Sequence, residues 1–337
     1  MRSGISVIIP TYNRQEFISA AIKSVLEQEY DGQIEVIVSD DGSTDKTVEI
    51  AKSFGHKVIV GLKPANWHSR GVAANRNRGL RLASQPLVCF LDSDDFYLPG
   101  HLKSISACME KNPACGFAFC RMLEMKKING KQLFKPWTHS RIFDRDVRNV
   151  AVSRSRIVHT NAFIFRRSVF DTVGYFDEVY TNGEDTDLWM RVSEKYKGCF
   201  SDHYGAVYTV EHDMGQLTKN AAEHLKKSYS EIYEKAIKRY HHLQLTDRYR
   251  LFKLKHWLVI LYYRQQRWQY YGRYLNLILT HPITFISSLP LLMSEYQEKR
   301  NRIKWRELNY YQELMNKKPD PVLREEKNRN NDHSKDK

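Results

Sequence analysis

Short apolar runs alternate with segments of helical periodicity through the first hundred residues. Four runs are apolar almost throughout, as expected of parallel strands buried on both faces, and they cover residues 5–9, 35–38, 57–60 and 86–91. Three segments between them carry apolar side chains at helical spacing, at residues 15–27, 47–54 and 72–83. This alternation predicts an α/β fold with a Rossmann-like, doubly wound sheet flanked by helices.

The second hundred residues contain fewer helical segments. The expected elements are a helix at residues 99–111, strands at 116–124 and 158–165, a helix at 184–196 and a last strand at 206–210. A polar, basic stretch at 126–155 separates the first two of these strands. Because parallel strands need long, usually helical crossovers, this half of the sheet should be mixed. We expect one sheet-based module in residues 1–220.

The composition changes beyond this module. Residues 221–315 predict a helical region that is rich in basic and aromatic side chains, with nine aromatics between Tyr249 and Tyr274. Residues 275–294 contain no Lys, Arg, Asp or Glu, but they include two prolines, a histidine and several hydroxyls. A membrane-spanning helix needs about 20 predominantly apolar residues, so a span is not the favoured interpretation. Residues 316–337 are charged and poor in apolar residues, which predicts a disordered tail.

The C-terminal region also carries most of the net charge of the chain. The formal net charge is +14, and residues 211–337 contribute ten of these charges. Such an excess favours a polyanionic neighbour, either nucleic acid or an anionic membrane surface. No recognised nucleic-acid motif is present and the first 210 residues are nearly neutral, so nucleic acid is not the expected partner. Basic and aromatic side chains suit an interfacial helix pair, and the alternative is a solvated helical appendage that packs on the module or mediates dimerisation.

The five cysteines are odd in number and lack the paired spacings of a disulfide framework or a zinc site. We expect free thiols in a reducing compartment. The short apolar stretch after Arg2 ends at Pro10, so the apolar region of a secretory signal is missing. These features predict a cytoplasmic protein, held peripherally at the inner face of the cell membrane if the C-terminal region is interfacial.

Polar clusters follow three of the four predicted parallel strands. They are Pro10 to Asn13, Asp40 to Ser43 and Asp92 to Asp95. In open α/β sheets, ligands bind beyond the carboxyl ends of the strands. The glycine-rich dinucleotide and phosphate-loop motifs are absent, so a phosphate would have to be held in another way. The D-x-D triplet of Asp92 and Asp94 suits a hard cation such as Mg²⁺ or Mn²⁺, although such triplets are also common as solvated turns or helix caps.

Five motifs together carry a family resemblance. In chain order they are I-S-V-I-I-P-T-Y-N-R (5–14), V-S-D-D-G-S-T-D (38–45), R-N-R-G (76–79), F-L-D-S-D-D (90–95) and N-G-E-D-T-D-L-W-M-R (182–191). Their order and spacing resemble those of a family 2 glycosyltransferase with the GT-A fold. The resemblance covers about residues 4–215, and it is specific for the fold and the reaction class but nearly silent on the sugar.

The resemblance implies a donor site. In similar enzymes the segment matching Pro10, Thr11, Tyr12 and Asn13 lines the nucleotide pocket, with the aromatic at Tyr12 near the base. The carboxylate matching Asp41 bonds the uracil of a UDP-sugar.

The same resemblance makes Arg76 a nucleotide or diphosphate contact. Asp92 and Ser93 would lie near the ribose. The metal, Mn²⁺ or Mg²⁺, would be bound by Asp94 with Asp92 and with His212, the late histidine that closes many such sites.

The resemblance also implies the chemistry. Glu184 and Asp185 match the acidic pair in which Asp185 is the catalytic base, and the reaction is a single displacement that inverts the anomeric carbon. The acceptor would be a hydroxyl of a glycan or of a lipid-linked saccharide.

Other interpretations of these residues remain open. The two acids could merely favour a helix N-terminus, Tyr12 could pack at a sheet edge, and His212 could be an ordinary hydrogen-bonded residue. The alternative functions are a non-catalytic sugar-nucleotide-binding relative, a nucleotidyltransferase and a nucleic-acid-binding protein.

Overall fold

The computed structural model describes residues 2–66, 71–137 and 159–210, and eight residues of a further helical segment between 228 and 239. His212, most of the expected region 221–315 and the expected tail 316–337 lie outside the described residues.

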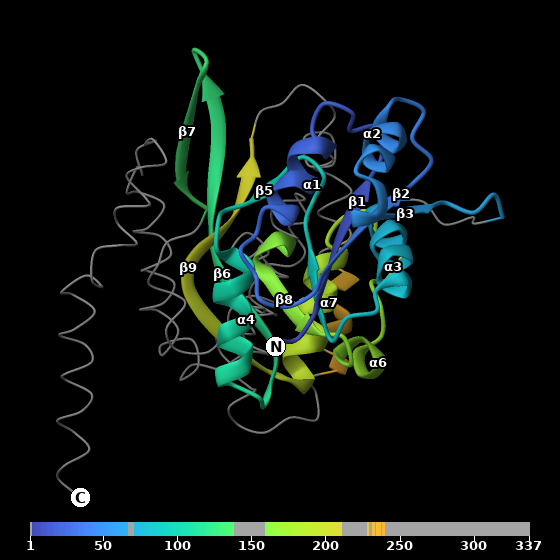
Figure 1. Ribbon diagram of the computed structural model, residues 1–337. Coiled ribbons are helices and arrows are strands. Elements are labelled where there is room, and N and C mark those ends of the chain that lie inside the picture. Colours follow the sequence, from blue (N-terminus) through green and yellow to red (C-terminus); the bar gives the residue numbers. More distant parts are fainter. Residues whose placement is uncertain are drawn as a thin grey trace, which may run out of the picture.

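One nine-stranded sheet forms the centre of the molecule, in the order β3-β2-β1-β4-β8-β6-β9-β5, with β7 paired to β6 (Figure 1). Its strands are β1 (Ile5–Thr11), β2 (Ile34–Asp40), β3 (Val58–Leu62), β4 (Leu87–Phe90), β5 (Phe96–Tyr97), β6 (Cys115–Ile128), β7 (Lys131–Pro136), β8 (Phe163–Arg166) and β9 (Lys197–Thr209). β3, β2, β1 and β4 are parallel neighbours. β8 is antiparallel to both β4 and β6, whereas β9 runs parallel to β6. The predicted mixed α/β sheet is therefore confirmed.

The helices pack on this sheet. They are α1 (Ile18–Leu26), α2 (Thr47–Ser53), α3 (Val72–Leu82), α4 (His101–Lys111), α6 (Val169–Val173) and α7 (Glu184–Lys195), with short 3-10 turns at Gly55–Lys57 and Thr160–Ala162. α3 packs on β1 and β2, and α4 packs on β9 and β6. Gly79 permits the close approach of α3, because a Cβ there would lie 2.4 Å from Cγ2 of Ile8.

Apolar strands and the inner faces of the helices form the main core. β1 is buried at every position, as its continuous apolar pattern predicts. Trp189 of α7 stacks on Phe163 and Phe165 of β8, with ring centroids 4.1 and 5.1 Å apart. This stacking ties α7 to the sheet, and α7 carries the predicted acidic pair in its first turn.

The strand expected at 116–124 ends too early, and residue 126 does not begin a stretch that lies outside the sheet. β6 extends to Ile128 and returns as β7, so that Lys126 pairs with Leu133. Asn129 and Gly130 form the turn with positive φ angles of 49° and 78°. Such angles suit an Asn-Gly hairpin turn, which was the overlooked sequence signal. The strand expected at 206–210 is also longer, because β9 begins at Lys197.

All five cysteines are free thiols, as expected. Among the described residues, no helix is long and apolar enough to cross a membrane.

Candidate active site

The carboxyl ends of three neighbouring strands form the candidate site. β1 lies between β2 and β4 and is parallel to both, so the segments that follow these strands meet at one edge of the sheet. β8 enters the sheet antiparallel to β4. The residues that precede β8 therefore lie at the same edge, which adds His159 and Asn161 to the three clusters that the sequence predicts.

Hydrogen bonds connect the segment after β1 to the segment after β2. Asn13 has a positive φ of 51°, its amide donates to Oγ of Ser43 at 2.9 Å, and its side-chain oxygen accepts from the amide of Thr44 at 2.8 Å. Thr11 is buried, whereas Tyr12 is 53% exposed. Tyr12 therefore does not pack into the sheet edge, and its ring is accessible to a ligand.

Asp40 and Asp41 have different surroundings although they are adjacent. Asp40 accepts hydrogen bonds from the amides of Gly42 and Ser43, so its carboxylate closes its own turn. Asp41 instead faces two cations, with Nη2 of Arg78 at 2.8 Å and Nζ of Lys63 at 3.3 Å. Only Asp41 directs its carboxylate toward other elements, as the resemblance implies for a base-binding acid.

Arg76 lies at the centre of a buried ion-pair network, here called the Arg76 network. Its Nη1 donates to Glu184 at 2.6 Å and its Nη2 to Asp92 at 2.7 Å. The guanidinium thus connects the D-x-D segment to the first turn of α7. Sequence reasoning predicted a nucleotide contact for Arg76 and missed that this arginine joins the two acidic motifs.

The two carboxyl groups of the Arg76 network have shifted pKa values. Burial raises the pKa of Asp92, but the charges of Arg76, His159 and Arg14 outweigh this effect and lower it overall. Burial, followed by the charge of Asp185, raises the pKa of Glu184 to about 7 despite the opposing charge of Arg76. Asp92 is therefore an ionised acid, whereas Glu184 takes up a proton as the pH falls through about 7.

The other carboxylates of the acidic segment have distinct partners. Nε of Arg14 lies 3.5 Å from Asp94. Asp95 is buried and accepts from Nδ2 of Asn161 at 2.6 Å and from the amide of Thr209 at 2.7 Å. Burial and the nearby charges of Asp94 and Asp92 raise the pKa of Asp95 well above its usual range. Negative charges on these neighbouring acids repel one another, and a bound cation would reduce this repulsion.

Donor atoms for a cation gather at this point. A carboxylate oxygen of Asp92, one of Asp95 and a ring nitrogen of His159 all lie within 4.8 Å of one another, and Nε2 of His159 is 3.6 Å from Asp92. Carboxylate oxygens with an imidazole suit Mn²⁺, and the oxygens alone suit Mg²⁺. The predicted ligand Asp94 lies in the same segment, and His212 lies outside the described residues. His159 and Asn161 were missed because their place depends on the direction of β8.

Glu184 and Asp185 begin α7, as predicted. Gly183 precedes them with a φ of 85°, a conformation that favours glycine and turns the chain into the helix. Glu184 is buried against Arg76, whereas Asp185 is partly exposed and accepts from the amide of Thr186 at 2.6 Å. Of the pair, Asp185 has the more accessible carboxylate.

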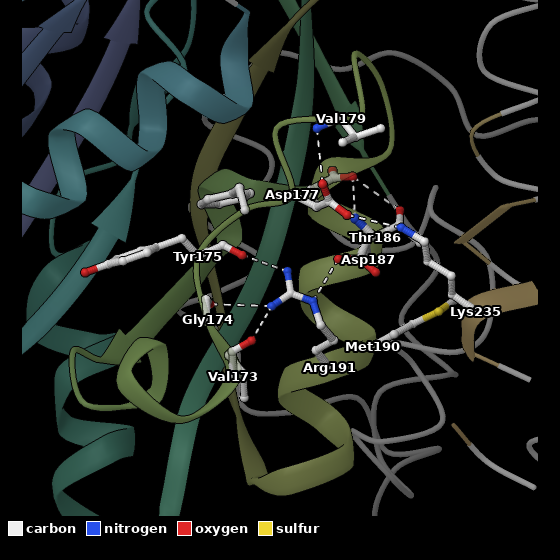
Figure 2. A network of polar contacts seen from close by, with 12 residues as sticks. Val173, Gly174, Tyr175, Asp177, Val179, Thr186, Asp187, Met190, Arg191 and Lys235 are labelled. Carbon is white, nitrogen blue, oxygen red and sulfur yellow. Dashed lines mark hydrogen bonds and ion pairs between the residues drawn. The ribbon is translucent and has the colours of Figure 1, made fainter. Parts of the chain in front are cut away.

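Further polar contacts hold α7 beyond its first turn (Figure 2). Arg191 donates to Asp187 one turn earlier at 2.8 Å, and to the carbonyls of Val173 and Tyr175 at 2.5 and 2.8 Å. These contacts fix α7 to the segment that follows α6.

The helical segment between 228 and 239 adds a second set of contacts. Nζ of Lys235 lies 3.2 Å from Asp177, and Nε of Arg239 lies 2.9 Å from Glu194. Ile232 and Ala236 are fully buried. Part of the basic C-terminal region therefore packs beside α7.

Comparison with known proteins identifies the family of this chain. The family model "Glycosyl transferase family 2" matches residues 6–174, and the chain belongs to this family. The fold is accordingly the GT-A fold that the resemblance implied.

Two curated relatives illustrate the similarity. The chain is 29% identical over 190 residues to the poly(ribitol-phosphate) beta-N-acetylglucosaminyltransferase TarS of Staphylococcus aureus, a match that covers 55% of this chain and 32% of TarS. It is 28% identical over 195 residues to the GalNAc(5)-diNAcBac-PP-undecaprenol beta-1,3-glucosyltransferase of Campylobacter jejuni, covering 56% of this chain and 59% of that enzyme. The chain thus matches about a third to three fifths of the length of these relatives.

Solved structures share the fold. The structure of residues 1–349 of S. aureus TarS in complex with UDP has a TM-score of 0.59 and 22% identity, and the match covers 77% of this chain and 72% of that one. A mannosyltransferase from Pyrobaculum calidifontis, in complex with GDP-Man and Mn²⁺, has a TM-score of 0.53 and 19% identity, with 84% and 82% covered.

Proposed function

We propose that this protein is an inverting, metal-dependent glycosyltransferase that moves a sugar from a UDP-sugar to a hydroxyl of a glycan or lipid-linked acceptor. One observation carries the proposal: in a family 2 chain, Arg76 joins the acidic segment after β4 to the acidic first turn of α7, within 2.7 Å of each. The metal-binding acids and the base are thereby held at one edge of the sheet.

The donor nucleotide binds beyond β1 and β2. Pro10, Thr11 and Asn13 form the wall of the pocket, and the exposed ring of Tyr12 stacks on the base. Asp41 accepts from the uracil N–H, for which its position toward Arg78 and Lys63 gives support. The UDP-bound relative with the same fold supports uridine as the nucleoside.

A divalent cation completes the donor site. Asp94 and Asp92 would hold Mn²⁺ or Mg²⁺, with Ser93 near the ribose and His212 closing the site, and the cluster of Asp92, Asp95 and His159 supplies further donor atoms. When bound, the metal neutralises negative charge on the leaving nucleoside diphosphate. The closely spaced donor atoms and the Mn²⁺-containing relative support this assignment.

Asp185 acts as the general base on the acceptor hydroxyl. It is the partly exposed acid of the pair, and it lies in the first turn of α7. Glu184 orients the site through Arg76 rather than by taking the proton, because its carboxyl group is buried and faces the guanidinium. Attack on the face opposite the diphosphate inverts the anomeric carbon.

The acceptor and the location rest on the C-terminal half. We propose that residues 1–220 form the catalytic module, that the basic and aromatic region 221–315 contacts an anionic membrane surface, and that 316–337 is a disordered tail. The protein then works peripherally at the cytoplasmic face of the membrane on a surface-glycan precursor. The polymer and undecaprenol-linked acceptors named for two relatives support this class of acceptor.

A thermal-shift panel tests the donor assignment. UDP, GDP, CMP and common UDP-sugars are added to the full-length chain with and without Mn²⁺, and the melting temperature is followed. Specific binding raises the melting temperature by mass action. The expected result is stabilisation by UDP that requires Mn²⁺ and is lost in Asp94→Ala.

An exposed acid provides the matched control. Asp171→Ala in α6 lies away from the strand ends and should respond to UDP as the wild type does. Equal stabilisation of Asp94→Ala and wild type would contradict the metal assignment, and the absence of any response to nucleotides would contradict the transferase function.

A further inference from the structure

A second group of metal-ligating side chains lies away from the candidate active site. His101 is the first residue of α4, Cys120 lies on β6 and His203 lies on β9. They are 0%, 2% and 8% exposed. We call these three residues the His–Cys cluster, and none of the five motifs includes any of them.

The donor atoms of the His–Cys cluster point toward one another. Nδ1 of His101 is 3.1 Å from Nε2 of His203, and Sγ of Cys120 is 3.9 Å from the same Nδ1. All three donor atoms lie within 4.8 Å of one another. With typical zinc bond lengths, tetrahedral coordination needs about 3.3 Å between two nitrogens and about 3.6 Å between nitrogen and sulfur. Two of the three distances therefore lie within a few tenths of an ångström of those in a coordination shell.

The surroundings are those of a metal site rather than of an ordinary apolar core. Nδ1 of His203 lies 2.9 Å from Oγ of Ser201, an outer contact of the kind that orients a ligating imidazole. Gly205 faces the donor atoms, and a Cβ there would lie 2.1 Å from Nδ1 of His101 and 2.7 Å from Sγ of Cys120. Nε2 of His101 is buried without a hydrogen-bond partner. The other three ring nitrogens of His101 and His203 each have a polar atom within 3.1 Å.

The charge state also suits a metal. Burial lowers the pKa of His203 to about 4 and that of His101 well below its usual range, so both imidazoles are neutral and keep a lone pair. Burial raises the pKa of the Cys120 thiol, so this thiol keeps its proton until a cation displaces it.

We propose that His101, Cys120 and His203 bind a thiophilic transition-metal ion, with Zn²⁺ as the best match to a thiolate and two imidazoles. Binding forms two nitrogen–zinc bonds and one sulfur–zinc bond, releases the Cys120 thiol proton to solvent and leaves one position for a water molecule. The ion connects α4 to β6 and β9. It is separate from the cation of the proposed transferase site, so either proposal can fail without the other.

Metal analysis of the full-length chain tests this proposal. The protein is incubated with Zn²⁺, passed through a desalting column and analysed for zinc by mass spectrometry. The expected result is one zinc per chain in the wild type and in Cys89→Ala, and none in Cys120→Ala or His203→Ala. Cys89 is the matched control because it is equally buried but lies outside the His–Cys cluster.

Two spectroscopic and thermal measurements complete the test. Co²⁺ in place of Zn²⁺ should give thiolate-to-cobalt charge-transfer absorption in the wild type and not in Cys120→Ala. Saturating Zn²⁺ should raise the wild-type melting temperature by about 5 °C. The proposal is overturned if the wild type retains no zinc, or if Cys120→Ala retains as much as Cys89→Ala, which would assign the ion to other thiols or to surface histidines.

Discussion

The Arg76 network and the His–Cys cluster are both buried polar groups, but they compensate for burial in different ways. Arg76 keeps its charge, and ion pairs of 2.6 and 2.7 Å connect it to Glu184 and Asp92. The imidazoles of His101 and His203 lose their charge instead, and they share one contact of 3.1 Å. A buried charge must be paired, whereas a buried histidine can become neutral at modest cost.

This difference predicts opposite responses to pH. The pKa of Glu184 is raised to about 7, so its protonated form adds stability at low pH that is lost as the pH rises toward 7. The pKa of His203 is lowered to about 4, so the neutral form adds stability at neutral pH that is lost on acidification. The Arg76 network is thus a charged region at the proposed active site, whereas the His–Cys cluster is a neutral region away from it.

The largest expected effect is a loss of activity, which should follow a change at the proposed active site and not a change in the His–Cys cluster. Asp185→Asn should lower kcat by about 10²- to 10⁴-fold, because a general base supplies a factor of this size. Release of UDP from a UDP-sugar with acceptor measures the rate, and UDP-dependent stabilisation should be unchanged. Cys120→Ala is the control and should keep kcat. A normal rate in Asp185→Asn would remove this residue from the mechanism.

The Arg76 network should dominate stability. Arg76→Met leaves the buried carboxyl group of Glu184 and the partly buried one of Asp92 without their cation, which should cost about 3–5 kcal/mol of unfolding free energy. Urea denaturation at pH 7 measures the change. Arg81→Met, at an exposed position on the same helix, should change stability far less. Similar losses in the two variants would mean that the ion pairs contribute little.

The His–Cys cluster should make the metal-free protein sensitive to acid. The unfolded chain protonates His203 near pH 6.5, whereas the folded chain resists protonation until about pH 4. Stability should therefore fall between these pH values, by about 3 kcal/mol from His203 alone. Denaturation at several pH values in EDTA measures this, and His203→Gln should flatten the curve. An unchanged slope in His203→Gln would show that other groups cause the acid sensitivity.

The support of α7 should give the smallest effect. Arg191→Ala removes bonds to Asp187 and to the carbonyls of Val173 and Tyr175, which should cost about 2 kcal/mol. Thermal unfolding measures the loss, with Lys195→Ala in the last turn of α7 as the control. If α7 positions the base, kcat should fall while the KM for the donor stays constant; a change in KM alone would contradict that role.

Several features of this protein could be predicted from local sequence. Continuous apolar runs such as residues 5–9 predict buried parallel strands, and the acids that follow them predict a site at the strand ends. The Asn129–Gly130 hairpin was equally predictable from its dipeptide, but it was included in the polar stretch expected between two strands. The short strand β5 offers two residues of pattern, too few for periodicity to identify.

The candidate site could be predicted only in part, for a physical reason. Asp41, Asp92 and Asp185 follow recognisable segments, so their neighbourhood is encoded locally. The pairing of Arg76 with Glu184 joins residues 108 positions apart. Nothing near either residue in the chain records this contact, because it depends on where α7 packs against β8.

By itself, the sequence determined the class of fold, the edge of the sheet where we propose that ligands bind and the family to which the chain belongs. The tertiary structure decided which of the neighbouring acids is buried, which is paired and which remains accessible. It also brought His159 to the acidic segment and assembled the His–Cys cluster from three distant elements. Burial and charge pairing arise from contacts between elements, and these interactions, rather than residue identity, set the pKa and the accessibility of each group.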